Sequence, residues 1–482
     1  MRALLLIPPD EVLGNVVRDF VYGCWCGGNL VGGIQMPPLS QLYVATVLQQ
    51  DGVRVRLVDA SQDREVYDRA LASAEELDAL VLLTSTNSFR QDALVGRAFK
   101  AANPRLRTVF FGAHPTFQPE ACLDDPGVDV GVMREPEWVM RDLFRAWRRG
   151  ESGHDVPGLA FRHDGRVVVN PPYPFIVDLD ELPLPDRSLL PADARYFNPV
   201  ARRLPFTSMQ TSRGCWAECD FCTVPSFFGN KVRWRSAAHV LAEIRQVVNA
   251  GTREIMFRDE TFTAHKARNA AICQGIIDQG LDVTWVCNAR VDRIDEQQVA
   301  LMKRAGCHLI KFGVESGDQR ILDGIRKGIT LAQTRAAFAA CRAHGVETHA
   351  HVMLGCPGET WETVDRTIAF LQELEPATAS FGIYTPYPGT DIFDRVQADH
   401  PEIADGTDAE LGKLHVKGFF NQHFSQLEGH ELERAVRVAY RRFYLRPGFL
   451  LRRARATASP AELLRRIRAA QRIVQFSVLG RN

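Results

Sequence analysis

The sequence predicts an α/β protein with two parallel sheets in succession, joined by an irregular segment. Short apolar runs alternate with helical patterns, which is typical of parallel sheets with right-handed crossovers. This alternation occurs twice, once before residue 145 and again after residue 205. The chain has 482 residues, more than one hydrophobic core normally serves, so we expect more than one domain.

Residues 1–145 are predicted to form a Rossmann-like domain. Strands are expected at 2–7, 53–58, 77–84 and 108–111, and helices at 41–50 and 92–102. Ligands of such open sheets bind at the carboxyl ends of the strands. The polar residues at these ends are Thr84, Ser85 and Thr86 after one strand and Gly112, His114 and Thr116 after another.

Residues 146–204 are predicted to form a linker. Eight prolines lie between 157 and 199. Proline has no backbone N–H and a fixed φ, so this density breaks regular elements. We therefore expect a segment that runs over the surfaces of its neighbours.

Residues 205–403 are predicted to form an open, partial (β/α)6 barrel. Its strands are expected at 206–211, 254–257, 284–287, 309–313, 348–353 and 378–384. Active groups of barrels collect at the carboxyl ends of the strands. The candidate residues there are Cys215, Cys219, Cys222, Asp259, Glu260, Asn288, Arg290, Glu315, Gly355 and Pro357.

Three cysteines within residues 214–222 are the most informative feature of the chain. Cys215, Cys219 and Cys222 are spaced so that their thiolates can close on one iron–sulfur cluster. Three thiolates leave one iron of a [4Fe-4S] cube open for a further ligand. A zinc knuckle and three unrelated buried thiols are the alternatives, but zinc usually takes four ligands in paired spacing and no second pair follows nearby.

Composition narrows the class of protein further. Lys+Arg and Asp+Glu are both 58, so the formal net charge is +0 and no nucleic-acid partner is expected. Eleven cysteines and the lack of a signal-peptide pattern favour a reducing compartment and a cytoplasmic location. No apolar stretch is long enough to cross a bilayer.

The CxxxCxxC loop, with Phe221 before its last cysteine, resembles the radical S-adenosylmethionine (SAM) superfamily. The resemblance implies a [4Fe-4S] cluster on Cys215, Cys219 and Cys222, with SAM as a second cofactor. By position, it implies SAM contacts from Phe221, Asp259, Glu260, Asn288, Arg290, Glu315, Gly355 and Pro357. The glycines of the usual Gly-Gly-Glu-like turn are missing before Glu260, and salt bridges at the barrel rim are the alternative role for Arg290 and Glu315.

The Rossmann-like domain ahead of the cysteine loop is similar to the cobalamin-binding branch of that superfamily. Its GG-H-x-T-like turn is matched by residues 112–116, and its GE-E-like turn, imperfectly, by residues 134–137. The resemblance implies cobalamin contacts from Thr84, Ser85, Thr86, Gly112, His114, Thr116 and Glu135. The DxHxxG box that supplies an axial histidine in many cobalamin proteins is absent, although this branch typically binds the cofactor without it. A Rossmann-like domain that holds no cofactor is the alternative.

The resemblance implies an enzyme that cleaves SAM reductively to a 5'-deoxyadenosyl radical. The radical removes hydrogen from an unactivated carbon, and methylcobalamin then delivers a methyl group. A flavodoxin- or ferredoxin-type electron donor is implied as a partner. Oxidative cyclisation or ring rearrangement without net methyl transfer stays open, and a non-catalytic corrinoid or redox sensor is the remote alternative.

Residues 404–482 are predicted to be helical and to end in a basic amphipathic tail. Its arginines are Arg452, Arg453, Arg455, Arg465, Arg466, Arg468 and Arg472. Such a helix can lie on an anionic membrane surface, or it can pack on the barrel with a solvated face. A similar tail in family members that modify lipids or porphyrins favours a hydrophobic, lipid-like or natural-product small molecule as the substrate.

Overall fold

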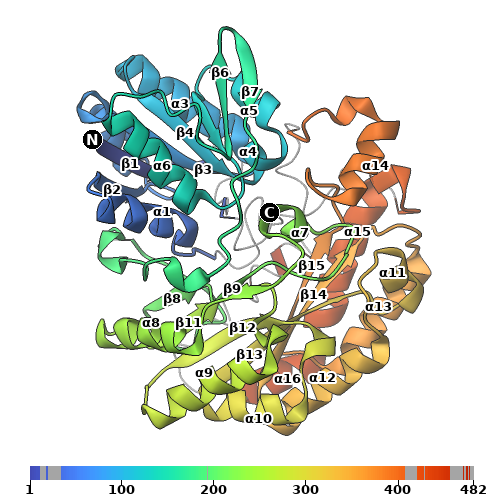
Figure 1. Cartoon of the computed structure of the whole chain (residues 1–482). Coiled ribbons are helices and arrows are strands. Elements are labelled where there is room, and N and C mark those ends of the chain that lie inside the picture. The colour runs from blue at the N-terminus through green and yellow to red at the C-terminus, as the bar shows by residue number, and fades with distance from the viewer. Residues whose placement is uncertain are drawn as a thin grey trace.

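The computed structural model describes residues 1–10, 18–19, 34–192, 194–407, 421–427 and 429–455, together with residues 471, 474–475 and 477. Two sheets with helices packed on them form two lobes (Figure 1). The predicted fold class, two successive α/β units with parallel sheets, is confirmed. No helix within the described ranges is both long and apolar enough to span a membrane.

The first sheet has seven strands in the order β2-β1-β3-β4-β5-β6-β7. Its parallel strands are β1 (Arg2–Ile7), β2 (Arg54–Asp59), β3 (Ala79–Thr84), β4 (Arg107–Gly112) and β5 (Val130–Val132). Its helices are α1 (Leu39–Gln50), α2 (Arg64–Ala72), α3 (Phe89–Ala102), α4 (Ala113–Phe117), α5 (Pro119–Asp124) and α6 (Pro136–Arg148). Helices α1 and α6 share one core with the sheet, while α2, α3 and α5 share another on the opposite face.

The central strand β3 is a continuous apolar run in the sequence because both of its faces are buried. All six of its residues are buried. Val81 and Leu83 belong to the core under α1 and α6, whereas Leu80 and Leu82 belong to the core under α2 and α3. Both faces of the sheet are therefore covered, as parallel sheets require.

The proline-rich segment contains regular structure that its composition did not predict. Strands β6 (Leu159–His163) and β7 (Arg166–Val169) form an antiparallel hairpin that extends the first sheet. Pro157 precedes β6, and Pro171 and Pro172 follow β7, so no proline removes a ladder hydrogen bond. The expectation that prolines exclude regular elements from this segment was wrong because they flank the strands.

The second sheet has six parallel strands in the order β15-β14-β13-β12-β11-β8. They are β8 (Phe206–Met209), β11 (Glu254–Phe257), β12 (Thr284–Ala289), β13 (Cys307–Glu315), β14 (Glu347–Leu354) and β15 (Thr378–Ile383). A separate antiparallel pair is β9 (Ser212–Arg213) with β10 (Arg233–Trp234). The helices are α7 (Val224–Phe228), α8 (Ala237–Asn249), α9 (Lys266–Asp278), α10 (Glu296–Arg304), α11 (Gln319–Gly324), α12 (Leu331–Ala343), α13 (Trp361–Leu374), α14 (Asp391–Asp399), α15 (Gly429–Tyr444) and α16 (Pro447–Arg455).

Short 3₁₀ turns complete the described elements. They are η2 (Ala74–Glu76), η3 (Leu179–Glu181), η4 (Arg187–Leu189), η5 (Phe262–Ala264), η6 (Val291–Arg293), η7 (Pro401–Ile403) and η9 (Asn421–His423).

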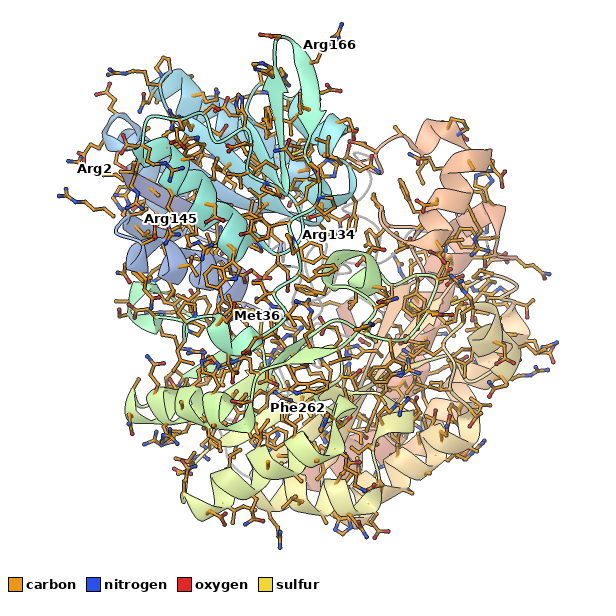
Figure 2. All side chains as sticks on the ribbon, viewed as in Figure 1. Arg2, Met36, Arg134, Arg145, Arg166 and Phe262 are labelled. Carbon is orange, nitrogen blue, oxygen red and sulfur yellow. The ribbon has the colours of Figure 1, made fainter. Side chains whose placement is uncertain are left out.

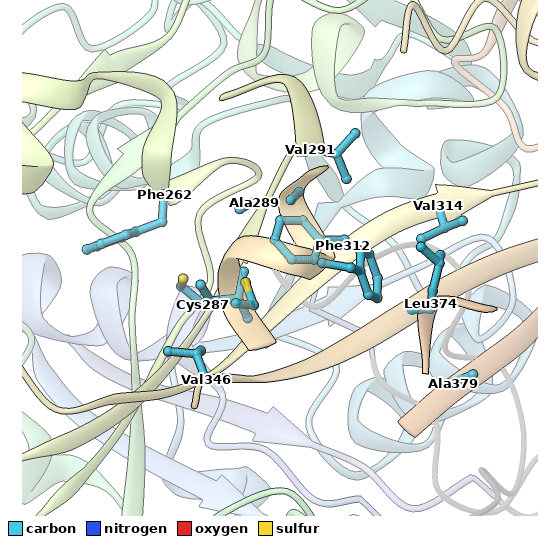
Figure 3. Packing of buried hydrophobic residues seen from close by; sticks show 14 of the residues in the cluster. Phe262, Cys287, Ala289, Val291, Phe312, Val314, Val346, Leu374 and Ala379 are labelled. Carbon is cyan, nitrogen blue, oxygen red and sulfur yellow. The ribbon is translucent and has the colours of Figure 1, made fainter. Parts of the chain in front are cut away.

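The largest core lies between the outer face of the second sheet and its helices. Figure 3 shows Phe262, Cys287 and Phe312 within this core, and Phe257 stacks on Phe262 at a ring distance of 4.6 Å. Helix α15 closes the same face beside β15 through Phe443. On the opposite, inner face, buried apolar residues such as Val286 and Leu309 are followed toward the carboxyl ends of the strands by half-buried polar residues such as Lys311 and His349.

Two arginines of the predicted basic tail lie in the described structure, and both bind the barrel. On α16, Arg453 pairs with Glu347 at 2.6 Å, and Arg452 pairs with Glu375 at 2.9 Å. This part of the tail packs on the barrel, as in the second of the two predicted alternatives. The side chains of Arg455, Arg465, Arg466, Arg468 and Arg472 lie outside the described residues.

Candidate functional site

The three cysteines lie in a loop that begins after β9, at the carboxyl end of the second sheet. Cys215 is buried, Cys219 and Cys222 are half-buried, and all three are free thiols. Gly214 makes the sharp turn into this loop, with φ +90°. A Cβ there would lie 2.3 Å from the carbonyl oxygen of Lys231, so only glycine fits.

Asp220 anchors this loop to the rest of the barrel. Its carboxylate accepts hydrogen bonds from the Tyr384 hydroxyl at 2.8 Å and from Arg395 at 2.9 Å. Its amide donates to the carbonyl of Ile325, and its carbonyl accepts from the amide of Ile392. The loop is therefore held between the end of β15 and the start of α14.

Two cations lie beside the cysteines. Burial lowers the pKa of Lys327, but Glu315 and the thiol of Cys219 more than offset this, so the pKa stands above its ordinary value. Burial also lowers the pKa of Arg290, and its partner Asp292 with the cysteine thiols more than offsets that effect. Burial raises the pKa of the Cys215 thiol, and the charge of Arg290 acts in the opposite direction.

This set of donors suits a cluster rather than a single ion. In the described part of the chain, no three Cys, His, Asp or Glu side chains converge to hold one metal ion. The zinc knuckle would require such convergence, whereas the three thiolates of an iron–sulfur cube each bind a different iron. The nearby Arg290 and Lys327 can offset the negative charge of a thiolate-bound cluster.

Glu315 ends β13 in a strained conformation. Its φ is 61°, which is uncommon for a residue other than glycine. Its Oε1 accepts a hydrogen bond from Lys327 Nζ at 2.6 Å. A Cβ on Gly313 would lie 2.3 Å from that carboxylate oxygen and 2.6 Å from Nζ, so the missing side chain leaves room for the pair.

Two neighbouring carboxylates after β11 have different surroundings. Asp259 is fully buried and accepts hydrogen bonds from the amide and hydroxyl of Thr211, while Asn288 donates to its carbonyl at 2.9 Å. The Oε2 of Glu260 is buried and has no hydrogen-bond partner among the described residues. Burial, reinforced by Asp259, raises the pKa of Glu260 to about 8. Of the two predicted residues, Glu260 is the one with an open carboxyl group.

Hydrogen bonds with Glu359 and Asn421 fix the turn after β14. The amides of Gly355 and Cys356 donate to the Glu359 carboxylate, and Asn421 donates to the Gly355 carbonyl at 2.9 Å. Gly355 has φ +79°, and a Cβ there would lie 2.7 Å from Asn421 Nδ2. Pro357 follows in this turn and is half-buried.

Phe221 belongs to the cysteine loop and packs at the carboxyl ends of the barrel strands, which we call the barrel mouth. Its ring lies 6.0 Å from that of Tyr384 in an edge-to-face arrangement, and Lys327 Nζ lies 5.8 Å from its centroid. Tyr384 and Tyr387 are buried in an apolar cluster, so aromatic packing describes both.

At the carboxyl edge of the first sheet, the predicted residues meet in one turn. The Thr84 hydroxyl donates to Asp92 at 2.8 Å, and the Ser85 amide donates to Ser88. A Cβ on Gly112 would lie 2.4 Å from the Thr84 carbonyl oxygen. The neighbouring strands therefore approach each other closely only because residue 112 is glycine. Thr86 is buried beside them.

Helix α4 begins directly after this edge. The Thr116 hydroxyl donates to the Gly112 carbonyl at 2.6 Å and accepts from the amide of Arg134 at 2.8 Å. His114 is buried, and its ring stacks on Phe89 at 4.1 Å. Neither ring nitrogen has a hydrogen-bond partner among the described residues, and burial lowers the pKa of His114 to about 4.

Glu135 lies between the two lobes with both carboxylate oxygens engaged. It accepts from Arg213 at 3.0 Å, from Arg233 at 2.9 Å and from the amide of Ile176 at 2.9 Å. Glu137 binds the same Arg213 at 2.5 Å. We call Glu135, Glu137, Arg213 and Arg233 the bridging ion pairs. They connect the start of α6 to β9, two residues before the first cysteine.

A cavity lies between the lobes at the same place. Its lining includes Leu83 and Gly112 at the carboxyl ends of β3 and β4, with Phe227 and Phe228 of α7 on the other side. Figure 2 shows Arg134 near this junction, while Arg2 and Arg166 project from the periphery. The carboxyl edge of the first sheet therefore faces the segment that follows the cysteine loop.

Comparison with known proteins assigns the family. Residues 209–371 match the radical SAM superfamily, and residues 29–144 match the B12 binding domain. The chain is 32% identical over 461 residues to an uncharacterized methyltransferase of Pyrococcus horikoshii, covering 94% of each protein. The chain belongs to the B12-binding branch of the radical SAM superfamily.

Two further relatives agree with this assignment. This radical SAM protein is 29% identical over 443 residues to the anaerobic magnesium-protoporphyrin IX monomethyl ester cyclase of Rubrivivax gelatinosus, covering 88% of the chain and 76% of that protein. Its fold matches that of the radical S-adenosylmethionine methyltransferase TsrM from Kitasatospora setae, with a TM-score of 0.68 and 18% identity over 82% of the chain and 75% of TsrM.

The radical SAM protein is therefore an enzyme that uses a [4Fe-4S] cluster, SAM and cobalamin. The structure brings Cys215, Cys219, Phe221, Arg290 and Glu315 to one mouth. The carboxylates of Asp259 and Glu135 bind other side chains and amides of the protein. Asp259 accepts hydrogen bonds from Thr211, and Glu135 accepts them from Arg213 and Arg233. In this structure both side chains stabilise the fold through these contacts.

Sequence reasoning missed several residues of this radical SAM site. Asp220 carried a local signal, because it is one of the two acidic residues, with Glu218, inside the cysteine loop. Lys327 and Arg213 carried none, since their partners Glu315 and Glu137 are 12 and 76 residues away. Polar residues on the inner face of the second sheet were also missed, although they alternate with apolar ones along β14.

Proposed function

We propose that this radical SAM enzyme transfers a methyl group to an unactivated carbon of a small-molecule substrate with a hydrophobic body. The observation that carries the proposal is the juxtaposition of the carboxyl edge of the B12-binding sheet with α7, which directly follows the cysteine loop. The likeness to the magnesium-protoporphyrin IX monomethyl ester cyclase of Rubrivivax gelatinosus supports a hydrophobic substrate. The Pyrococcus horikoshii relative named a methyltransferase supports this reaction type.

We assign the cluster to Cys215, Cys219 and Cys222, beside the cations Arg290 and Lys327, which can offset the negative charge of a thiolate-bound cluster. We assign the SAM ammonium to Glu260, the buried carboxyl group with an open oxygen. When bound, the cluster with SAM supplies a carbon-centred radical, and cobalamin supplies the methyl group.

The remaining residues orient these groups and exclude water. Asp220 fixes the cysteine loop to Tyr384 and Arg395, so the thiolates keep their places when a ligand enters. The bridging ion pairs hold the B12-binding domain against β9, and the Thr84–Gly112 edge is the surface we assign to cobalamin. A flavodoxin- or ferredoxin-type protein is the electron donor we expect.

The proposal is tested by anaerobic reconstitution with iron, sulfide and hydroxocobalamin, followed by product analysis with SAM and a reductant. Methyl transfer predicts about four irons and one corrinoid per chain, formation of 5'-deoxyadenosine and, with substrate, formation of S-adenosylhomocysteine. Iron without corrinoid, or SAM cleavage that survives Cys215→Ala, would overturn the proposal.

Oxidative cyclisation is the second candidate, supported by the likeness to the Rubrivivax gelatinosus cyclase over 88% of the chain. The two reactions differ in stoichiometry. Methylation consumes a second SAM as methyl donor and releases S-adenosylhomocysteine, whereas cyclisation does not. Counting this product per 5'-deoxyadenosine separates them.

A further inference from the structure

Gln210 is a buried glutamine with one open hydrogen-bonding group. Its side chain is 3% exposed, and its Oε1 accepts a hydrogen bond from Arg213 Nε at 3.0 Å. A guanidinium only donates, so the amide oxygen must face it, which fixes the position of Nε2. Nε2 has no hydrogen-bond partner among the described residues. The open atom is therefore a donor, and the partner it requires is an acceptor.

An open donor at this depth needs a partner. A buried polar group that gives up its water for nothing carries the full cost of its desolvation. Natural proteins pair almost all such groups, through protein atoms, ordered water or a ligand. A ligand that brings an acceptor oxygen to Nε2 would remove this cost.

Gln210 directly follows β8 and faces the inner side of the second sheet. Met209 pairs with Phe257 of β11, and its carbonyl accepts a hydrogen bond from the amide of Arg258 at 2.8 Å. Met209 and Phe257 both belong to the outer core. Because successive side chains of a strand alternate, Gln210 lies on the opposite side, at the carboxyl end of the barrel.

Glu260 follows the neighbouring strand and lies near the same arginine. The Thr211 hydroxyl donates to the Asp259 carboxylate, and Glu260 is the next residue of the chain. Burial raises the pKa of Glu260, and the charge of Arg213 is among the effects that lower it, so the two groups lie within electrostatic range. The Oε2 of Glu260 also has no hydrogen-bond partner among the described residues. An open carboxyl oxygen and an open amide donor therefore lie near one guanidinium.

The cations beside the cysteines are already paired. Arg290 binds Asp292 at 2.9 Å, and Lys327 binds Glu315 at 2.6 Å. A carboxylate that enters here would compete with these acidic side chains for its partner. Nε2 of Gln210 offers a donor without such competition.

The two open groups match the two charges of an α-amino acid. The ammonium group and the carboxylate are attached to the same carbon atom, so their protein partners must lie close together. SAM carries this group at the end of its methionine part. We propose that Gln210 Nε2 donates a hydrogen bond to the carboxylate of SAM, beside the ammonium group assigned to Glu260. This inference rests on the proposed function, because it places SAM at the barrel mouth.

The B12-binding domain orients this donor. Glu135 and Glu137 bind Arg213 at 3.0 Å and 2.5 Å. A guanidinium bound to Oε1 polarises the amide, so that Nε2 donates more strongly. The bridging ion pairs therefore connect the B12-binding domain to the SAM carboxylate through Gln210.

Binding of SAM and of decarboxylated SAM tests the inference. Decarboxylated SAM keeps the adenosine, the sulfonium and the amino group but has no carboxylate. Each is titrated into the anaerobically reconstituted full-length enzyme in a calorimeter. Gln210→Leu should weaken SAM by about tenfold or more, the loss expected for one hydrogen bond to a charged group. It should weaken decarboxylated SAM by less than about threefold, because that ligand has no carboxylate to lose a partner.

Gln210→Glu keeps an oxygen for Arg213 but replaces the donor with a carboxylate oxygen. It should weaken SAM at least as much as Gln210→Leu does, because like charges then face each other. Decarboxylated SAM should not be weakened. A variant that merely misfolds would weaken both ligands.

Gln298→Leu provides the matched control. Gln298 of α10 is also buried, its Nε2 also lacks a partner among the described residues, and its Oε1 accepts from the amide of Asp295. This variant should leave the affinity for SAM unchanged. Unchanged SAM affinity in Gln210→Leu, equal losses in Gln210→Leu and Gln298→Leu, or equal losses of both ligands in Gln210→Glu would each overturn the inference. Failure of the proposed function reads out separately, as absent corrinoid or absent 5'-deoxyadenosine in the wild-type enzyme.

Discussion

The two sheets repeat the same strand–helix unit but expose different parts of it. Strand β3 of the first sheet buries every residue, and successive side chains enter two opposite cores. Strand β14 of the second sheet sends Ala350 and Val352 into a core and turns His349 and His351 to the inner face. The first sheet can therefore offer a ligand its carboxyl edge alone, whereas the second offers an edge and a face.

The largest expected effect separates the edge of the second sheet from its core. Cys219→Ala should reduce cluster iron and bring 5'-deoxyadenosine formation to background, because two thiolates cannot hold the cube. Cys341→Ala is the matched control, since Cys341 of α12 is buried in the outer core. Iron content and product are measured on both after anaerobic reconstitution. A Cys219→Ala protein that retains full iron and activity would show that Cys219 is no more a cluster ligand than the core residue Cys341.

The next effect compares covered faces with the inner face. Phe110→Ala, in the doubly covered first sheet, should lower the free energy of unfolding by about 3–5 kcal/mol. Phe312→Ala, on the outer face of the second sheet, should cost a similar amount. Lys311→Met on the inner face should change it by less than about 1 kcal/mol, because removing a partly desolvated charge offsets lost contacts. Denaturant unfolding measures all three, and a large loss for Lys311→Met would show that Lys311 stabilises the fold as much as the core residues do.

The junction between the sheets gives a smaller effect. Glu137→Gln should destabilise the contact between the lobes by about 1.5–3 kcal/mol, the value of one hydrogen bond to a charged group, while Glu135 still holds Arg213. Limited proteolysis of the connecting segment should then be faster. Glu151→Gln breaks an exposed pair with Arg149 and should change little. Equal cleavage of the two variants would show that the bridging ion pairs do not hold the lobes together.

The same contrast explains what the sequence could predict. The strands of the first sheet were readable because burial on both faces makes each a continuous apolar run, as in β3. The cysteine loop was readable because its chemistry is contained in eight consecutive residues, Cys215 to Cys222. Local composition carries both signals.

The features that the sequence did not predict depend on strand register and on partners far away in the chain. Lys311 and His349 become neighbours only because β13 and β14 pair in one particular register, and a shift by one residue would turn them to opposite faces. Glu135 matched a family turn, but its partners Arg213 and Arg233 lie 78 and 98 residues away. The hairpin β6–β7 was missed because proline density was counted over the whole segment rather than placed relative to the strands.

The smallest effect compares one buried titratable group at each carboxyl edge. His114, at the first sheet, has a pKa lowered by burial to about 4, and Glu359, at the second, has a pKa raised by burial to about 8. Both are neutral at pH 7, but their linkage to stability has opposite signs. The unfolded chain takes up the histidine proton first as pH falls, so the contribution of His114 is present above about 6.5 and lost toward 4. The unfolded chain loses the carboxyl proton first as pH rises, so the contribution of Glu359 is present below about 4.5 and lost toward 8.

Glu359→Gln keeps an acceptor for the amides of Gly355 and Cys356 but removes the titration. Compared with the wild type, its stability should therefore improve as pH rises from about 5 to 8, by at most about 1.4 kcal/mol per pH unit. The stability of His114→Phe relative to the wild type should instead improve as pH falls from about 6.5 to 4. Unfolding free energies measured across both windows check the signs. Parallel pH profiles for Glu359→Gln and the wild type would mean that the carboxyl group at the second edge is already ionised in the folded protein, and the two edges would then differ in charge as well as in shape.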